Sequence, residues 1–213
     1  MRVIAGSAKG HTLRVPKVPG LRPTSDRARE SLFNVLAAGM DGARVLDVFA
    51  GSGALGIEAL SRGAVEATYV ERSRRAAEVL ADNIEKCGFS DRATIIQADW
   101  RTALRRLDKG GVRGDASAVE GADERGDDGD ERGEGGDERG NASFDLALFD
   151  PPYDWEQADL CLSALAEHSL LAVEGLAVIE QRATTLLKMP DGWSHDRVLK
   201  VGDSAFWLCS MAG

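Results

Sequence analysis

The chain has 213 residues, of which 43% are hydrophobic, and a formal net charge of −9. This size suits one globular domain, and no stretch approaches the ~20 apolar residues of a membrane span, so a cytoplasmic protein is expected. Three scattered cysteines without CxxC spacing, and three histidines without ligand partners nearby, argue against a disulfide framework and a metal centre.

The charge is unevenly distributed along the chain. Residues 1–30 hold seven bases and two acids, whereas residues 108–140 hold twelve acids and five bases. A basic segment on an otherwise acidic protein is typical of a surface that binds a polyanion. Charge alone, however, is explained at least as well by a solvated N-terminal segment.

A β-hairpin is predicted at the N-terminus, with strands over residues 2–5 and 11–15. Its bases alternate with apolar residues, so one face can pack while the other meets phosphate. Prolines then mark an extended connector, and a helix is predicted over residues 24–39. We expect residues 1–21 to form a basic extension and residues 22–213 to form one domain.

From residue 43 onward, strands alternate with helices. Strands are predicted at residues 43–49, 67–71, 93–97, 144–149 and 176–180. This alternation predicts a Rossmann-like α/β fold, with a mostly parallel sheet covered by helices on both faces. Two last strands, near Val198 and at residues 206–208, follow each other too closely for a crossover helix, so they are expected to be antiparallel.

Residues 109–141 interrupt the alternation. Asp-Glu-Arg-Gly recurs there at a seven-residue spacing, without the apolar positions that a coiled coil requires. The segment is rich in glycine and charge and poor in large apolar residues. We therefore expect an acidic, disordered insertion at the surface.

A glycine-rich turn links the first of the alternating strands to its helix. Residues 51–56 match G-x-G-x-x-G, and Glu71 lies at the end of the next strand. The glycines permit close backbone approach to a ligand at a helix N-terminus, and Glu71 can accept hydrogen bonds from ribose hydroxyls. Taken alone, this pattern fits a nicotinamide oxidoreductase as well as a methyltransferase.

Two further acids favour the methyltransferase. Asp47 precedes the glycine turn, where a carboxylate suits the ammonium and sulfonium of S-adenosylmethionine and would be awkward beneath a dinucleotide's pyrophosphate. Asp99 follows the third strand. It can accept a hydrogen bond from an adenine amino group, cap the helix that follows, or do both.

The fourth strand ends in Asp150, Pro151, Pro152 and Tyr153. Two prolines in a row make the chain leave the sheet stiffly. A carboxylate, a carbonyl and an aromatic ring are thereby fixed at the sheet edge where α/β proteins bind ligands. A strand that ends in a proline-rich turn is the plainer interpretation of these four residues by themselves.

Taken together, residues 47–53, Glu71, Asp99 and residues 150–153 resemble class I S-adenosylmethionine-dependent methyltransferases that act on exocyclic amino groups of bases. Residues 2–6, 22–34 and 149–153 further resemble the RsmD family, which methylates a guanine N2 in 16S ribosomal RNA. The resemblance runs from the first residue to the last strands, and the acidic insertion is its one departure. It implies S-adenosylmethionine as cofactor and the small ribosomal subunit as partner.

The resemblance also implies roles for individual residues. Asp150 and the Pro151 carbonyl would accept hydrogen bonds from the guanine amine, and Tyr153 would stack on the base. The cofactor would be bound by Thr24, Arg27, Asp47, Phe49, Ala50, Gly51, Ser52, Gly53, Glu71, Arg72, Asp99 and Asp150. RNA phosphates would be bound by Arg2, Lys9, Arg14, Arg22 and Arg29. A monomer without a metal ion is expected.

Three other functions fit parts of the sequence. An adenine-N6 DNA methyltransferase is the alternative, because the same tetrapeptide serves there. Such enzymes usually carry a separate base-recognition domain, for which this chain has no room outside the insertion. A nicotinamide oxidoreductase would need neither Asp150 nor Tyr153, and a non-catalytic RNA-binding module would need none of the intact motifs.

Overall fold

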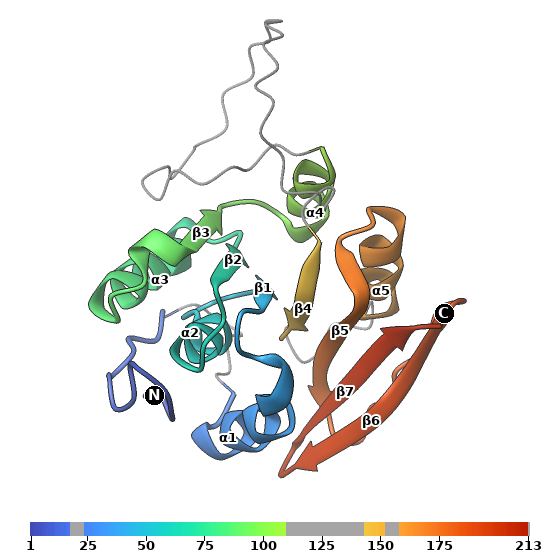
Figure 1. The fold of residues 1–213 in the computed structure, drawn as a ribbon, viewed down its shortest axis with the longest axis horizontal. Coiled ribbons are helices and arrows are strands. Elements are labelled where there is room, and N and C mark those ends of the chain that lie inside the picture. The colour runs from blue at the N-terminus through green and yellow to red at the C-terminus, as the bar shows by residue number, and fades with distance from the viewer. Residues whose placement is uncertain (18–23, 110–142, 152–157, 213) are drawn as a thin grey trace, which may run out of the picture.

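The computed structural model describes residues 1–17, 24–109, 143–151 and 158–212 (Figure 1). The α-helices in these ranges are α1 (Asp26–Val35), α2 (Ala54–Ser61), α3 (Arg74–Lys86), α4 (Trp100–Asp108) and α5 (Ala158–Glu167). Two short 3-10 helices are η1 (Ala37–Gly39) and η2 (Ser90–Arg92). The strands are β1 (Arg44–Val48), β2 (Glu66–Val70), β3 (Ala93–Ile96), β4 (Phe144–Phe149), β5 (Leu171–Arg182), β6 (Trp193–Val201) and β7 (Ser204–Met211).

These strands form one sheet in the order β3-β2-β1-β4-β5-β7-β6. The pairs among β1 to β5 are parallel, whereas β7 is antiparallel to both β5 and β6. The predicted mostly parallel sheet and the antiparallel final pair are therefore confirmed. From β1 the chain winds outward in one direction through β2 and β3, and in the other through β4 and β5. The crevice between β1 and β4 is thus the switch point at which doubly wound sheets bind ligands.

Helices cover both faces of the sheet, and each face has its own hydrophobic core (Figure 1). The alternation of side chains along β4 shows why both faces must be covered. Leu146 and Leu148 pack with α1, α2 and α3, whereas Ala147 and Phe149 pack with α4 and α5. A strand that is apolar on both sides can be buried only between two layers of helices.

Helix α1 shows how the local sequence sets an element's bounds. The Ser25 side chain accepts a hydrogen bond from the Ala28 N–H and so caps the start of the helix. The predicted helix over residues 24–39 is too long, because α1 ends at Val35 and residues 37–39 form η1 instead. None of the described helices is long and apolar enough to cross a membrane.

The N-terminal segment, residues 1–14, turns back on itself and packs against α2 and α3. Arg2 and Thr12 form an antiparallel bridge, so the predicted hairpin is present without two regular strands. Its ladder is short because the N–H groups of Ile4 and Ala5 donate to the carboxylate of Glu58 on α2. The predicted insertion, from residue 110 onward, lies outside the described residues.

Candidate active site at the carboxyl edge of the sheet

Three parallel strands, β1, β2 and β4, end level with one another at the switch point, and β5 runs beside them. Val48 of β1 aligns with Val70 of β2 and with Phe149 of β4, and Phe149 aligns with Ile179 of β5. The register therefore brings together the residues that follow each of them. These residues are Phe49, Glu71, Asp150 and Glu180.

The glycine-rich turn is tied directly to Glu71. The Gly51 N–H donates to Glu71 Oε2 at 2.9 Å, and the Ser73 N–H donates to Glu71 Oε1 at 2.7 Å. Each carboxylate oxygen keeps further acceptor capacity. Glu71 thus holds the turn in place and can still accept hydrogen bonds from a ligand hydroxyl.

Backbone conformation supports a functional role for the same turn. Phe49 has a φ of 66°, in the left-handed region that a bulky residue rarely adopts. Such strain is found where a site has to be held in one shape. Gly53 has a φ of +76°, which L side chains rarely adopt, and a Cβ there would lie 2.2 Å from Leu80 Cδ1, so glycine suits this position.

Asp47 is almost fully buried beneath the turn, with 1% of its surface exposed. Its Oδ2 accepts a hydrogen bond from the Gly56 N–H at 2.9 Å. Burial raises the pKa of Asp47 to about 7, and the charge of Glu71 acts in the same direction. A cation placed beside Asp47 would favour its ionised form, because the two opposite charges would meet in a region shielded from water.

Asp150 lies in a cluster of buried polar side chains. The Thr24 hydroxyl is 2.8 Å from Asp150 Oδ2 and 2.7 Å from Glu180 Oε2, and the Ser204 hydroxyl donates to Glu180 Oε1 at 2.7 Å. Burial and then the charge of Glu180 raise the pKa of Asp150 well above its usual value. The site therefore holds Asp150 in a fixed orientation while penalising its negative charge.

Asp99 follows β3, and Phe49 follows β1. The Asp99 carboxylate accepts a hydrogen bond from the Arg101 N–H at 3.0 Å, so its predicted capping role is present. Asp99 is exposed, and a contact with an adenine amine stays a prediction. The Phe49 ring lies 6.3 Å from the buried ring of Trp100, measured between centroids.

Some of the other predicted site residues lie within the described ranges and some lie outside them. Ala50 and Ser52 lie in the glycine turn, Pro151 is buried, and Arg27 and Arg72 are exposed. Arg22 and Tyr153, as well as Pro152, lie outside the described residues. The predicted contacts of all these residues with cofactor or base stay predictions.

The predicted RNA-binding bases differ in exposure. Arg2, Lys9 and Arg14 are exposed; Arg2 lies 3.8 Å from the carboxylate of Asp26 and Arg14 pairs with Asp82. Those three remain candidates for phosphate contacts.

The prediction that Arg29 binds RNA is wrong, because its side chain has no exposed surface. Its guanidinium instead donates to the Arg2 carbonyl and to Asp26, and lies 3.8 Å from Glu58. Desolvation by burial lowers the pKa of Arg29, and the charge of Asp26 counteracts this. Arg29 therefore helps to fix the N-terminal segment rather than to contact a ligand.

Sequence reasoning missed Glu180 and Ser204. The signal was present, because Glu180 is an acid at the end of an otherwise apolar predicted strand, as Asp150 is. What the sequence could not show was that β7 returns beside β5, where Ser204 is only two residues out of register with Glu180. Among the described residues, no group of three or more His, Cys, Asp or Glu side chains could hold a metal ion.

Comparisons with known proteins identify the family of the chain. A family model described as Conserved hypothetical protein 95 matches residues 1–115 and 129–210. Ribosomal RNA small subunit methyltransferase D of Escherichia coli (strain K12) is 32% identical over 209 residues, covering 98% of this chain and 88% of that protein.

Solved structures give the same fold. The structure of yhhF from Escherichia coli matches with a TM-score of 0.73 and 29% identity, covering 100% of this chain and 98% of that one. SMU.776, described as a putative methyltransferase complexed with SAH, matches with a TM-score of 0.61 at 12% identity, covering 89% of this chain and 50% of that one. This second likeness shows the fold alone. The predicted Rossmann-like class I methyltransferase fold is confirmed.

Proposed function

The chain belongs to the RsmD family, whose model is described as Conserved hypothetical protein 95, and we propose that it methylates the exocyclic N2 of a guanine in 16S ribosomal RNA. The observation that carries this proposal is the meeting of Asp47, Glu71 and Asp150 at one edge of the sheet. Its relative from Escherichia coli is named for the small-subunit ribosomal RNA, which supports the substrate class.

The carboxylates of the site fit S-adenosylmethionine. Asp47 accepts a hydrogen bond from the Gly56 N–H, and burial raises its pKa. The positive charge of the cofactor's methionine portion would lower that pKa again and so favour the ionised carboxylate. Glu71 can accept the two ribose hydroxyls, since each of its oxygens accepts one N–H of the turn and keeps a further lone pair. When bound between these residues, the cofactor would supply an electrophilic methyl group, with its sulfonium sulfur as the leaving group.

Asp150 and the Pro151 carbonyl then orient the nucleophile. An exocyclic amine of a purine is a poor nucleophile because its lone pair is delocalised into the ring. Hydrogen bonds from the two N–H groups to these acceptors favour a pyramidal nitrogen with its lone pair directed at the methyl group. The methylated nitrogen carries a positive charge and loses one proton easily, so Asp150 does not have to be a strong base.

Base and backbone of the RNA would be held by separate parts of the chain. Tyr153 would stack on the guanine once it leaves its own stack. Arg2, Lys9 and Arg14 of the N-terminal segment would bind phosphates. We take residues 1–21 as the RNA-binding extension of a methyltransferase domain that spans residues 22–213.

Radiolabelled S-adenosylmethionine tests the substrate class directly. The protein is incubated with unmethylated small ribosomal subunits, with free 16S ribosomal RNA and with DNA. Label is expected in ribosomal RNA, in the subunit or as the free molecule. Label in DNA adenine would support the DNA methyltransferase instead, although the relative's name gives that alternative no support.

A further inference from the structure

We propose that Glu180 is a positioning residue for Asp150, and that the two carboxyl groups titrate as one unit through the Thr24 hydroxyl. The inference rests on the proposed function for its consequence in catalysis. The pairing itself rests on geometry alone.

The hydrogen bonds around Thr24 require a shared proton. A hydroxyl carries one hydrogen, so it can donate to only one carboxylate. Thr24 Oγ1 lies at hydrogen-bond distance from both Asp150 Oδ2 and Glu180 Oε2. Both contacts are hydrogen bonds only if one of the carboxyl groups is protonated and donates to Thr24. If both were ionised, one contact would set a carboxylate oxygen against the lone pairs of the hydroxyl.

The surroundings of the pair strengthen this requirement. Glu180 is 3% exposed and Thr24 is 6% exposed, so water screens their charges little. The groups that face Asp150 come from four elements: Thr24 before α1, Asp47 on β1, Glu180 on β5 and, behind Glu180, Ser204 on β7. Two of these are further acids, and burial together with the charge of Glu180 raises the pKa of Asp150. Closely spaced carboxyl groups in such a site lose their protons in two separate steps.

This pairing has a consequence for the proposed reaction. Asp150 accepts a hydrogen bond from the substrate amine most strongly when it is ionised, because a charged acceptor makes the stronger bond. Glu180 therefore sets the pH at which the site becomes competent, and it fixes the orientation of the Asp150 carboxylate through Thr24. Ser204 holds Glu180 in turn at 2.7 Å.

The variant Glu180→Gln tests the pairing with little change of shape. Its amide can still bond to Thr24 and Ser204, but it carries no titrating proton. We expect the acid limb of kcat/KM to move to lower pH, so the ratio of the rates at pH 6 and pH 8 rises by about threefold or more, which corresponds to a displacement of about half a pH unit.

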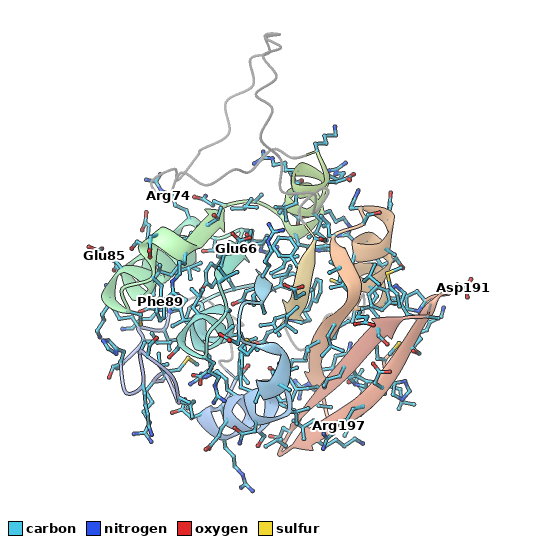
Figure 2. All side chains as sticks on the ribbon, viewed as in Figure 1. Glu66, Arg74, Glu85, Phe89, Asp191 and Arg197 are labelled. Carbon is cyan, nitrogen blue, oxygen red and sulfur yellow. The ribbon has the colours of Figure 1, made fainter. Side chains whose placement is uncertain are left out.

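The matched control is Glu85→Gln. This residue is exposed at the rim of the molecule, on α3 (Figure 2). The substitution makes the same chemical change as Glu180→Gln and should leave the pH profile of kcat/KM unchanged. An unmoved acid limb in Glu180→Gln, or an equal loss of rate at every pH, would overturn the proposal.

Thermal melts without cofactor or RNA separate this inference from the proposed function. The fall in melting temperature between pH 5 and pH 8 should be smaller in Asp150→Asn and in Glu180→Gln than in the unmodified protein. In the double variant this fall should be little smaller than in either single variant, because removing one charge already removes the repulsion between the two carboxylates. Additive changes would refute the pairing, even if the protein proved to methylate another substrate or none.

Discussion

Replacing Glu58 by alanine is expected to cause a large loss of stability. Its carboxylate accepts hydrogen bonds from the N–H groups of Ile4 and Ala5 and from Arg62 Nε, at 2.8–3.0 Å. It also lies 3.8 Å from Arg29, and neither of these two side chains has any exposed surface. The substitution would leave the buried guanidinium short of a counter-charge and two N–H groups without acceptors.

Removing one partner of a buried ion pair costs about 3–5 kcal/mol. For a chain of this size each kcal/mol lowers the melting temperature by about 2–4 °C. The expected loss for Glu58→Ala is therefore on the order of 6–20 °C, measured by circular dichroism or differential scanning fluorimetry.

A matched control is Glu78→Ala on α3. Glu78 also pairs with an arginine four residues away, Arg74, but both side chains are largely exposed, as the position of Arg74 in Figure 2 illustrates. Such pairs contribute at most about 0.5 kcal/mol. If Glu58→Ala and Glu78→Ala had the same melting temperature, the buried cluster would not be what anchors the N-terminal segment.

Three further predictions concern the site and the RNA. Asp150→Ala should abolish methyl transfer even with saturating cofactor, while calorimetry still finds cofactor binding through Asp47 and Glu71; normal turnover would disprove the role of Asp150. Burial raises the pKa of Asp47 to about 7, so the protonated form of Asp47 stabilises the folded protein. This contribution to the free energy of unfolding is complete below the unfolded pKa of about 4 and is lost as pH rises through about 7. The same ionisation should tighten binding of S-adenosylmethionine between pH 6 and pH 8, and Asp47→Asn should lose that tightening in calorimetry; an unchanged pH dependence would contradict it. Lys9→Ala should weaken RNA binding and reduce the slope of log K against log salt by about 1, whereas an unaltered slope would remove Lys9 from the phosphate contacts.

The sheet could be predicted because its signals are local. The apolar runs that became β1 and β4, each bounded by turn residues, show both the strand and its burial on two faces. Element ends were less predictable. The helix expected to reach Gly39 stops at Val35, because nothing in the sequence distinguishes the last turn of an α-helix from a 3-10 turn.

The site was predictable where it depends on strand ends and not where it depends on packing between distant segments. Glu71 and Asp150 follow strands, so a parallel sheet alone brings them together. Arg29 was misassigned because charge in the sequence does not show burial. Its neighbour Glu58 is 29 residues away in the chain, and only the packing of α1 on α2 reveals their pairing. Glu180 was missed for the same reason.

The central claim is tested most directly by identifying the methylated nucleoside. Unmethylated small ribosomal subunits are incubated with the protein and S-adenosylmethionine, and the 16S ribosomal RNA is digested and analysed by mass spectrometry. The account predicts N2-methylguanosine at a single position, and none when Asp150→Ala replaces the unmodified protein. N6-methyladenine, or N2-methylguanosine formed equally well by Asp150→Ala, would contradict it.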